Sequence, residues 1–501
     1  MFTYSGLLEG FNSAAQAFGS ILVGPLMTLF RVGDVMTWSM LSFAMLAMII
    51  MCLEKDTGGT MPSTCVTVGV KPPKCTGAIS GTWNILQIFP IFIFGGIPYG
   101  IIEMIRRVIP QQIMGGDEHK LKKMDSLVHV YYEIAGTSGA FFSAYVSLIC
   151  GKAYGTIITP PLYTFAAISW YFLGLKSPEP SDEDLKNQKA MADAANIFQK
   201  AKLFLIYCKL ALYGFFESVY DGGLIVFFDT RFQWLFFGYT IPLVMHRYIE
   251  NGVGQYYAKL ELEESAYASF IISGSNFGEL LGALFVFWNL NTFYTPIPFV
   301  RWDALVLNFT WLFYNAVRRE TCPGVETSDI AGIMAAVMAF ISAGWAAGDV
   351  SMAAYIQSNI PNLEISTKNT NPLGAVMSFL YASYIVIYAI ISPVIGKWID
   401  EYKSDADWQK KLSSQKGISS ATKKMYLAKQ QALLKEQKDV YFFWIAGVFF
   451  SLISIPIFFN TFVPKGSWAW NPRAIGDDIQ VPQVELVNME DDEVEKTINY
   501  A

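Results

Sequence analysis

A histidine, an arginine and a glutamate lie close together in LVMHRYIENG, a stretch between two long apolar runs. Glu250 follows His246 by four residues and Arg247 by three, so on a helix its carboxylate can meet either side chain on one face. Histidine titrates near neutral pH, and arginine binds carboxylates in a bidentate manner. The trio could therefore exchange protons or bind an anionic group. The alternatives are an ion pair that only holds the helix in place, or residues at a water-facing helix end.

A second group of ionisable residues occurs in MDSLVHVYYEIAGTSG, where Asp125, His129 and Glu133 follow one another at four-residue intervals. Residues spaced in this way share one face of a helix. Glu133 comes nearest to the middle of its apolar run, and the small residues after it allow a neighbouring helix to approach closely. A carboxyl group in such a place suits proton coupling, because burial penalises its charged form. The alternative is that Asp125 and His129 lie at the aqueous interface and Glu133 pairs structurally with a neighbour.

Further polar residues interrupt the apolar runs of the second half of the chain. Asn276 and Glu279 are three residues apart in GSNFGELLG and share a face with Ser273, while Asp349 and Gln357 flank SMAAYI. Such residues can line a cavity, or they can hold helices together in lipid through polar contacts. The complete set of candidate substrate-binding or proton-coupling residues is Glu133, His246, Arg247, Glu250, Asn276, Glu279, Asp349 and Gln357.

The composition is that of a polytopic membrane protein. Of the 501 residues, 53% are hydrophobic and only 16% are charged, and the mean hydropathy is +0.34. Runs such as MLSFAMLAMIIMCL are apolar on every face, which favours spanning helices over the alternating strands of an outer-membrane barrel. A net charge of −6 spread over several loops argues against a nucleic-acid partner.

Motifs for metal binding and catalysis are missing from the sequence. The six cysteines form no CxxC and no Cys/His metal spacing, and the sequence contains no GxSxG, GxxxxGK[ST] or HExxH. We therefore predict no metal site, no cofactor, no enzyme activity and no ATP site. Cys65 and Cys75 share one polar loop, and a disulfide there depends on whether that loop faces an oxidising compartment.

Eleven apolar runs predict the transmembrane helices of an all-α fold. They cover roughly residues 10–30, 36–53, 83–105, 126–150, 155–175, 233–255, 266–288, 302–318, 328–356, 373–396 and 439–462.

Polar segments divide these helices into two groups. We predict a first helical bundle in residues 1–175, a cytosolic polar linker in 176–202, a second bundle in 229–465 and a polar acidic tail in 466–501. The remaining segment, 203–228, is apolar but carries two acids and a lysine, which favours an amphipathic helix at the membrane interface over a twelfth span.

The two groups show a weak internal repeat. AFGSILVGPL (17–26) resembles NFGELLGALF (276–285), and each has Phe-Gly with a second small residue one turn later. In the second group, a predicted span (233–255) precedes the helix that contains NFGELLGALF. In the first group, only the nine residues MFTYSGLLE precede the predicted helix that contains AFGSILVGPL. The sequence therefore predicts that one helix is missing at the N-terminus.

In this order the segments resemble a major facilitator superfamily transporter. GSILVGPLMTLFRVGD is similar to the loop motif between the second and third helices of that family, with Arg31 and Asp34 retained. RRVIPQQIMGGDEHKLKKMDSLVHVYYEIAGTSGAF, MHRYIENG, GSNFGELLGALFVF and AGDVSMAAYIQ are similar to a fungal-type branch of unknown substrate. The resemblance covers most of the chain and implies two helical bundles around a central cavity, here without the first helix.

The resemblance also implies an orientation in the membrane. It would place residues 106–125 in the cytosol, in agreement with their five lysines and arginines. Residues 397–438 are also rich in lysine, yet they would lie on the opposite side.

These features predict a secondary transporter that moves a small solute by alternating access, coupled to protons as a symporter. Glu133 and Glu250 would accept protons, His246 and Arg247 would contact substrate or tune the carboxylates, and the other candidates would line the cavity. The expected partners are a small-molecule substrate, protons and the lipid bilayer, and the chain is expected to be a monomer in the plasma or vacuolar membrane. The alternatives are a transporter-like nutrient receptor that binds without transport, and a membrane-embedded enzyme.

Overall fold

The computed structural model describes residues 2–62, 64–66, 74–76, 79–114, 118–151, 154–173, 189, 197–289, 292–315, 324–359, 372–414, 419–473 and 475. Nearly all regular structure in these ranges is helical, as expected for an all-α fold. A short antiparallel hairpin of β1 (Thr64–Val66) and β2 (Lys74–Thr76) was not expected, and its register places Cys65 opposite Cys75.

The described residues of the first half form five long helices. They are α1 (Phe2–Leu29), α2 (Val32–Asp56), α3 (Ile88–Met114), which follows the 3-10 turn η1 (Ile85–Gln87), α4 (Glu118–Cys150), and α5 (Thr159–Phe172), which follows the 3-10 turn η2 (Tyr154–Ile158). Within this half α1 packs on α3, and α2 packs on both α3 and α5.

In the described residues of the second half, the helices form six groups that match the predicted spans, and several groups are built from consecutive helical pieces. The first contains η3 (Phe236–Thr240), α8 (Ile241–Tyr248), η4 (Ile249–Gly254) and α9 (Gln255–Leu260), and it is followed by α10 (Tyr267–Trp288). The next contains α11 (Ile297–Val306), η5 (Leu307–Trp311) and α12 (Leu312–Asn315), followed by α13 (Thr327–Asn359) and α14 (Pro372–Ser413). The last contains α15 (Ser420–Val440), η7 (Tyr441–Phe449) and α16 (Phe450–Asn460).

Each of the eleven predicted spans coincides with one of these helices or groups. Among the described residues, eight helices are long and apolar enough to cross a membrane. Helices suit this composition because, in lipid, every backbone N–H and C=O must be satisfied within the chain. The protein is therefore an integral, multi-pass membrane protein.

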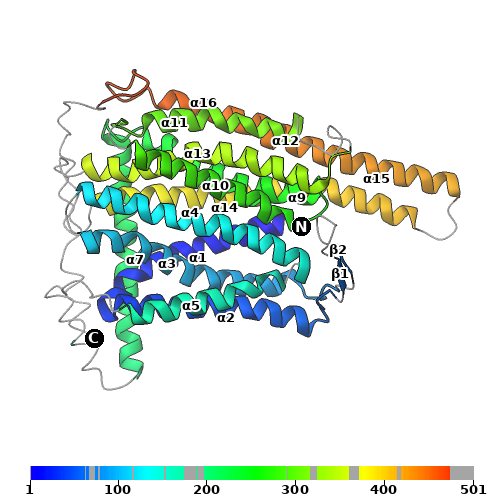
Figure 1. Ribbon diagram of the computed structural model, residues 1–501, viewed down its shortest axis with the longest axis horizontal. Helices are drawn as coiled ribbons and strands as arrows, with labels where there is room; N and C mark the ends of the chain where they lie inside the picture. The colour runs from blue at the N-terminus through cyan, green and yellow to red at the C-terminus, as the bar shows by residue number, and fades with distance from the viewer. Residues whose placement is uncertain are drawn as a thin grey trace.

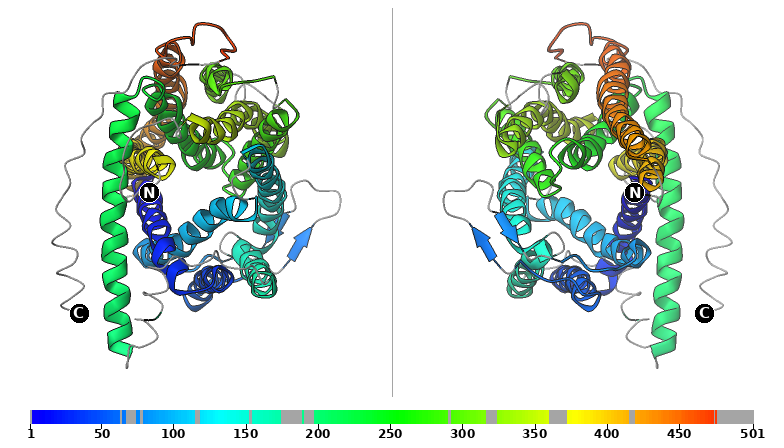
Figure 2. Two further views of the ribbon diagram at one scale, coloured as in Figure 1. Left: turned by 90° about the vertical axis from the view of Figure 1, so that its left-hand side faces the viewer. Right: turned by 90° about the vertical axis from the view of Figure 1, so that its right-hand side faces the viewer.

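The helices form two groups that face each other, which agrees with the expected two-bundle architecture. Viewed end-on, α1 to α5 lie on one side and α8 to α16 on the other (Figure 2). The groups meet where α4 packs on α10 and where α1 packs on α14. We call this boundary the seam.

Helix α7 (Ile197–Phe228) runs crosswise to the other helices (Figures 1 and 2). It packs on α14 and on α1, so it touches both halves at the seam. It begins at Ile197, earlier than the predicted boundary at residue 203. Its length and composition would also allow a span, but a helix that crosses its neighbours fits the membrane interface, and that location remains a prediction.

Helix α14 is longer than a membrane span. Its 42 residues correspond to about 63 Å, twice the roughly 30 Å of the hydrocarbon layer. Its second part and α15 project together beyond the bundles, at the same end as β1 and β2 (Figure 1). The described residues of the lysine-rich segment 397–438 lie in this projection, at one end of the molecule.

A row of glycines fixes α10 against α13. Gly274, Gly278 and Gly282 follow one another at one-turn spacing, and a Cβ at any of them would collide with the main chain of α13. Small residues let two helix backbones approach closely in lipid. This contact sets the rotation of α10 and turns Asn276 and Glu279 toward α4.

The chain after α16 folds back onto α11. Arg301, which is fully buried, donates to Thr461 Oγ1 at 2.9 Å, to the Ala469 carbonyl at 2.5 Å and to the Ser467 carbonyl. Its guanidinium also lies 3.9 Å from the centroid of the Phe462 ring. The predicted boundary of the acidic tail at residue 466 is therefore too early, because residues 466–473 belong to the folded second half.

Candidate functional site

Arg247 and Glu250 form an ion pair in the first span of the second half. Arg247 Nη1 lies 3.0 Å from Glu250 Oε2, so of the two partners allowed by the spacing, the arginine meets the glutamate. Arg247 lies in the last turn of the short helix α8, and Glu250 lies in the π-helical turn η4. Such turns widen a helix locally and occur often at functional sites.

Glu250 is held in position by a hydrogen-bond chain within the second half. The Ser275 hydroxyl of α10 donates to Glu250 Oε1 at 2.8 Å, and Ser275 Oγ lies 2.7 Å from Ser342 Oγ of α13. Both serines are buried. One carboxylate oxygen of Glu250 thus bonds to arginine and the other to serine, which fixes its orientation.

His246 has a different partner from the one expected. Its Nε2 lies 2.8 Å from Asp303 Oδ1 of α11, and its ring stacks on Trp345 with centroids 5.2 Å apart. Its side chain is 4% exposed. His246 therefore belongs to a buried pair inside the second half, where a solute in the seam does not reach it in this conformation.

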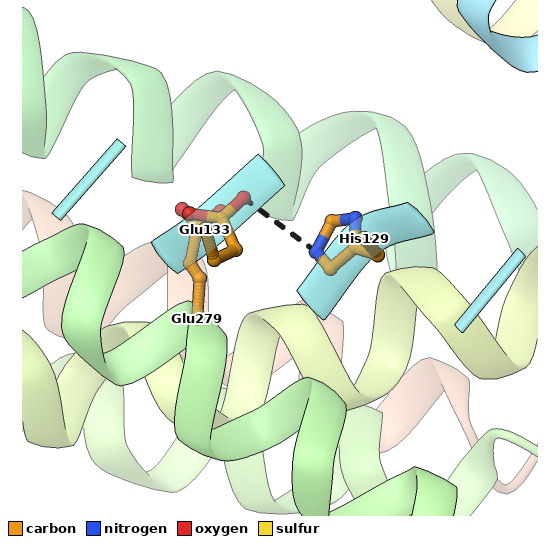
Figure 3. Close-up of side chains that lie close together, drawn as sticks. All are labelled: His129, Glu133 and Glu279. Atoms are coloured by element: carbon orange, nitrogen blue, oxygen red, sulfur yellow. Dashed lines mark ion pairs between the residues drawn. The ribbon is translucent and has the colours of Figure 1, made fainter. Parts of the chain in front are cut away.

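Glu133 and Glu279 approach each other across the seam. Figure 3 shows their carboxyl groups face to face, Glu133 from α4 and Glu279 from α10, with His129 one turn from Glu133. His129 Nε2 lies 3.7 Å from Glu133 Oε1. One possible metal-ligand atom from each of the three residues, a ring nitrogen or a carboxylate oxygen, lies within 4.8 Å of the other two. Small residues allow this contact as expected, because Gly136 of α4 packs against the Asn276 side chain.

The charge of Arg247 joins these groups into one electrostatic unit. Arg247 acts on Glu133 of α4, on Glu279 of α10 and on Glu9 of α1. We call Glu9, Glu133, Arg247, Glu250 and Glu279 the central cluster. It draws two carboxyl groups from the first half, and two carboxyl groups and the arginine from the second.

The accessible surface of Arg247 faces the interior of the molecule. Its side chain is 47% exposed, yet it interacts with Tyr99 of α3 and Tyr384 of α14 as well as with the central cluster. These partners surround it from both halves. We infer that a charged group exposed on such a side faces a polar space between the halves, since exposure of arginine to lipid costs several kcal/mol.

The other predicted residues lie at varying distances from this cluster. Asn276 contacts α4 at Gly136, and the charge of Asp349 acts on Glu279. Gln357 lies in the last part of α13 and Asp125 in the first part of α4, but their side chains are outside the described residues.

Three members of the site were missed from the sequence. Glu9 was placed before the first span, because the predicted helix began at residue 10, although LLEGFN continues an apolar run. Ser275 and Ser342 gave no signal, since single serines are common in membrane helices. Glu9 could have been found by asking which acids lie within apolar sequence, the criterion that identified Glu133.

Comparison with known proteins gives structural similarity only. No protein-family model matches the chain, and no curated protein matches it. Among solved structures it is similar to a mutant of the nucleoside transporter NupG, with 12% identity, a TM-score of 0.46, and 88% of this chain and 91% of that chain covered. It is similar to the human organic anion transporter MFSD10 (TETRAN), with 13% identity, a TM-score of 0.43, and 90% and 83% covered. It is also similar to the xylose transporter XylE from E. coli in a partially occluded inward-open conformation, with 12% identity, a TM-score of 0.39, and 89% and 97% covered.

Proposed function

We propose that the protein is a secondary transporter of the major facilitator type, which carries a small solute through the seam by alternating access and is coupled to protons. The observation that carries the proposal is the central cluster: ionisable groups from both halves meet in the interior of the helical assembly. Ionisable residues inside a membrane protein are costly, and where they occur they mark solute and proton pathways.

The two halves have the contacts that a rocking motion needs. The halves touch along α4 with α10 and α1 with α14, and close glycine contacts occur both within a half, between α10 and α13, and at the seam, where Gly6 of α1 meets the main chain of α14. A rocking motion would change the α4–α10 and α1–α14 contacts, and the contacts within each half would stay in place.

Glu133 and Glu279 suit the coupling role. Two carboxylates in contact repel each other, and a proton on one of them relieves the repulsion. If the halves separate at the seam, the two carboxyl groups move apart. The repulsion between their charged forms then falls, and the pair binds the proton less tightly. Proton uptake and release would thus follow the rocking motion.

Arg247 and Glu250 suit the solute-binding role. The half-exposed guanidinium of Arg247 offers hydrogen-bond donors to the seam, and Ser275 holds Glu250 in place behind it. Asn276 and Asp349 are proposed to line the same space. His246 is proposed to support α8 through Asp303.

The proposal is tested with the purified protein in sealed proteoliposomes. A panel of radiolabelled sugars, nucleosides, carboxylates and amines is offered with an imposed proton gradient. We expect accumulation of one class that collapses when an uncoupler removes the gradient. Binding of a solute without accumulation would favour the nutrient receptor instead, and chemical conversion of the solute would favour an enzyme.

A further inference from the structure

Among the described residues, the central cluster holds more carboxyl groups than basic groups. Arg247 is neutralised by Glu250 at 3.0 Å, and at the edge of the site Arg106 is neutralised by Glu103 at 2.7 Å. Glu9, Glu133 and Glu279 remain. Their nearest basic neighbour outside these pairs, among the interactions described, is His129, which lies 3.7 Å from Glu133.

Burying these unpaired carboxylates costs free energy, which a bound cation or proton must offset. Carboxylates held at membrane depth are stable only when they are paired or protonated. Protons can fill the role when the site is empty. When the site is occupied, a positively charged solute can balance the carboxylates, and two or three of them attract it at once.

The tyrosines beside the cluster provide a second feature that suits a cation. The guanidinium of Arg106 lies over the Tyr132 ring of α4, 4.0 Å from the ring centroid. The hydroxyls of Tyr99 and Tyr132 lie 3.3 Å apart. Tyr384 of α14, which belongs to the second half, interacts with Arg247. Aromatic faces attract ammonium groups, and the attraction is stronger when water is excluded.

We propose that the solute bound at the central cluster is a cation, whose charge lies between Glu133 and Glu279; an organic cation would place its apolar part against Tyr99 and Tyr132. This inference rests on the proposed function, because it names the solute class of the same site. The positive charge can belong to an organic ammonium group or to a divalent metal ion, since His129, Glu133 and Glu279 offer one nitrogen and two oxygen ligands.

Equilibrium binding to the purified full-length protein in lipid nanodiscs tests the inference without requiring transport. The probes are radiolabelled tetraethylammonium, zinc chloride and, as an anion of similar size, benzoate. We expect tetraethylammonium or zinc to bind and benzoate not to bind. Binding of tetraethylammonium alone identifies an ammonium site, and binding of zinc alone identifies a metal site.

Isosteric variants show whether the cation lies where we place it. Glu133→Gln and Glu279→Gln should each weaken binding at least tenfold, the loss expected for a charge contact of about 1.4 kcal/mol. Glu401→Gln, on the exposed surface of the α14 projection, removes the same charge and should change nothing. Each variant is first checked for an unchanged melting temperature.

In the binding experiment, three outcomes would overturn the inference: binding of benzoate in preference to both cations, no binding of either cation, or full binding by Glu133→Gln and Glu279→Gln. Proton-driven accumulation of a neutral or anionic solute would also reject the cation and leave the proposed function intact. Cation binding without accumulation in proteoliposomes would reject transport and leave the cation site intact.

Discussion

Glu133 of α4 and Glu279 of α10 face each other across the seam, one from each half of the molecule. Neither position is fixed by its own helix alone. The contact of Gly136 with Asn276 brings α4 close to α10, and the glycine row of α10 sets the rotation that turns Glu279 toward α4. The carboxyl pair is thus a product of packing on two sides of one helix.

Glu133→Gln should remove or shift the pH dependence of solute accumulation. The amide keeps the size of the side chain but cannot take up and release the coupled proton. The groups that act on Glu133 are Glu250, Glu279, Arg247, Arg106 and His129, all of which stay in place. Initial rates of accumulation in proteoliposomes, measured over a range of pH, check the prediction, with Glu401→Gln as the control. An unchanged pH profile would remove Glu133 from the coupling role.

Arg247→Gln should abolish accumulation and should also alter the neighbouring carboxyl groups. The change leaves Glu250 with Ser275 as its remaining partner, and unpairing a buried charge costs about 3–5 kcal/mol. The double variant Arg247→Gln with Glu250→Gln should recover much of the lost stability but no transport. Thermal unfolding and proteoliposome uptake are measured together. Transport at the wild-type rate by either variant would contradict the role of the pair.

His246→Ala should destabilise the second half. It would leave Asp303 buried without its partner, while Asp303 Oδ2 already lacks a hydrogen bond among the described residues. The expected loss is about 3–5 kcal/mol in the free energy of unfolding. His246→Leu combined with Asp303→Leu should restore stability, because an apolar pair of similar volume removes the unpaired charge. A loss below about 0.5 kcal/mol for His246→Ala would show that the pair has little structural role.

Gly278→Val should be far more harmful than an alanine at Gly139. A side chain at Gly278 would collide with the Ala339 carbonyl, whereas nothing lies within 4 Å of a Cβ at Gly139. Overpacking costs about 1–3 kcal/mol or more, while alanine stabilises an exposed helix position by up to about 1 kcal/mol relative to glycine. Melting temperatures of the two variants provide the comparison. Equal melting temperatures would mean that α10 does not depend on close contact with α13.

Asp400→Ala should loosen the seam at the end where α14 begins to project. The Asp400 carboxylate accepts hydrogen bonds from the backbone amides of Phe2 at 3.0 Å and Thr3 at 2.8 Å, so a residue of the second half caps a helix of the first. Loss of a helix cap costs about 0.5–2 kcal/mol. Asp405→Ala, at an exposed position on the same helix, is the matched control. If both variants unfold at the same temperature, the cap does not join the halves.

The sequence predicted the spans well, because the requirement for about 20 apolar residues per helix leaves a clear signal. It predicted the partners of charged residues less well. Spacing alone allowed Glu250 to meet His246 or Arg247, and the choice depends on Asp303, which is 57 residues from His246 and comes close only in the folded chain. Ends of elements were the least certain, since α1 takes in Glu9 and α7 begins at Ile197.

The central claim is that Arg247 opens into a water-filled space between the two halves, and thiol labelling tests it most directly. In a variant without native cysteines, Arg247→Cys and Val386→Cys are compared using a charged, membrane-impermeant methanethiosulfonate reagent. Both native side chains are about half exposed, 47% for the side chain of Arg247 and 57% for Val386. Val386, however, lies two residues after Tyr384 and so on the far side of α14, toward lipid.

We predict rapid labelling of the Arg247→Cys variant, with access to the reagent from one side of the membrane at a time, and no labelling of the Val386→Cys variant. Failure of the reagent to reach the thiol at position 247, or equal labelling at the two positions, would contradict the account.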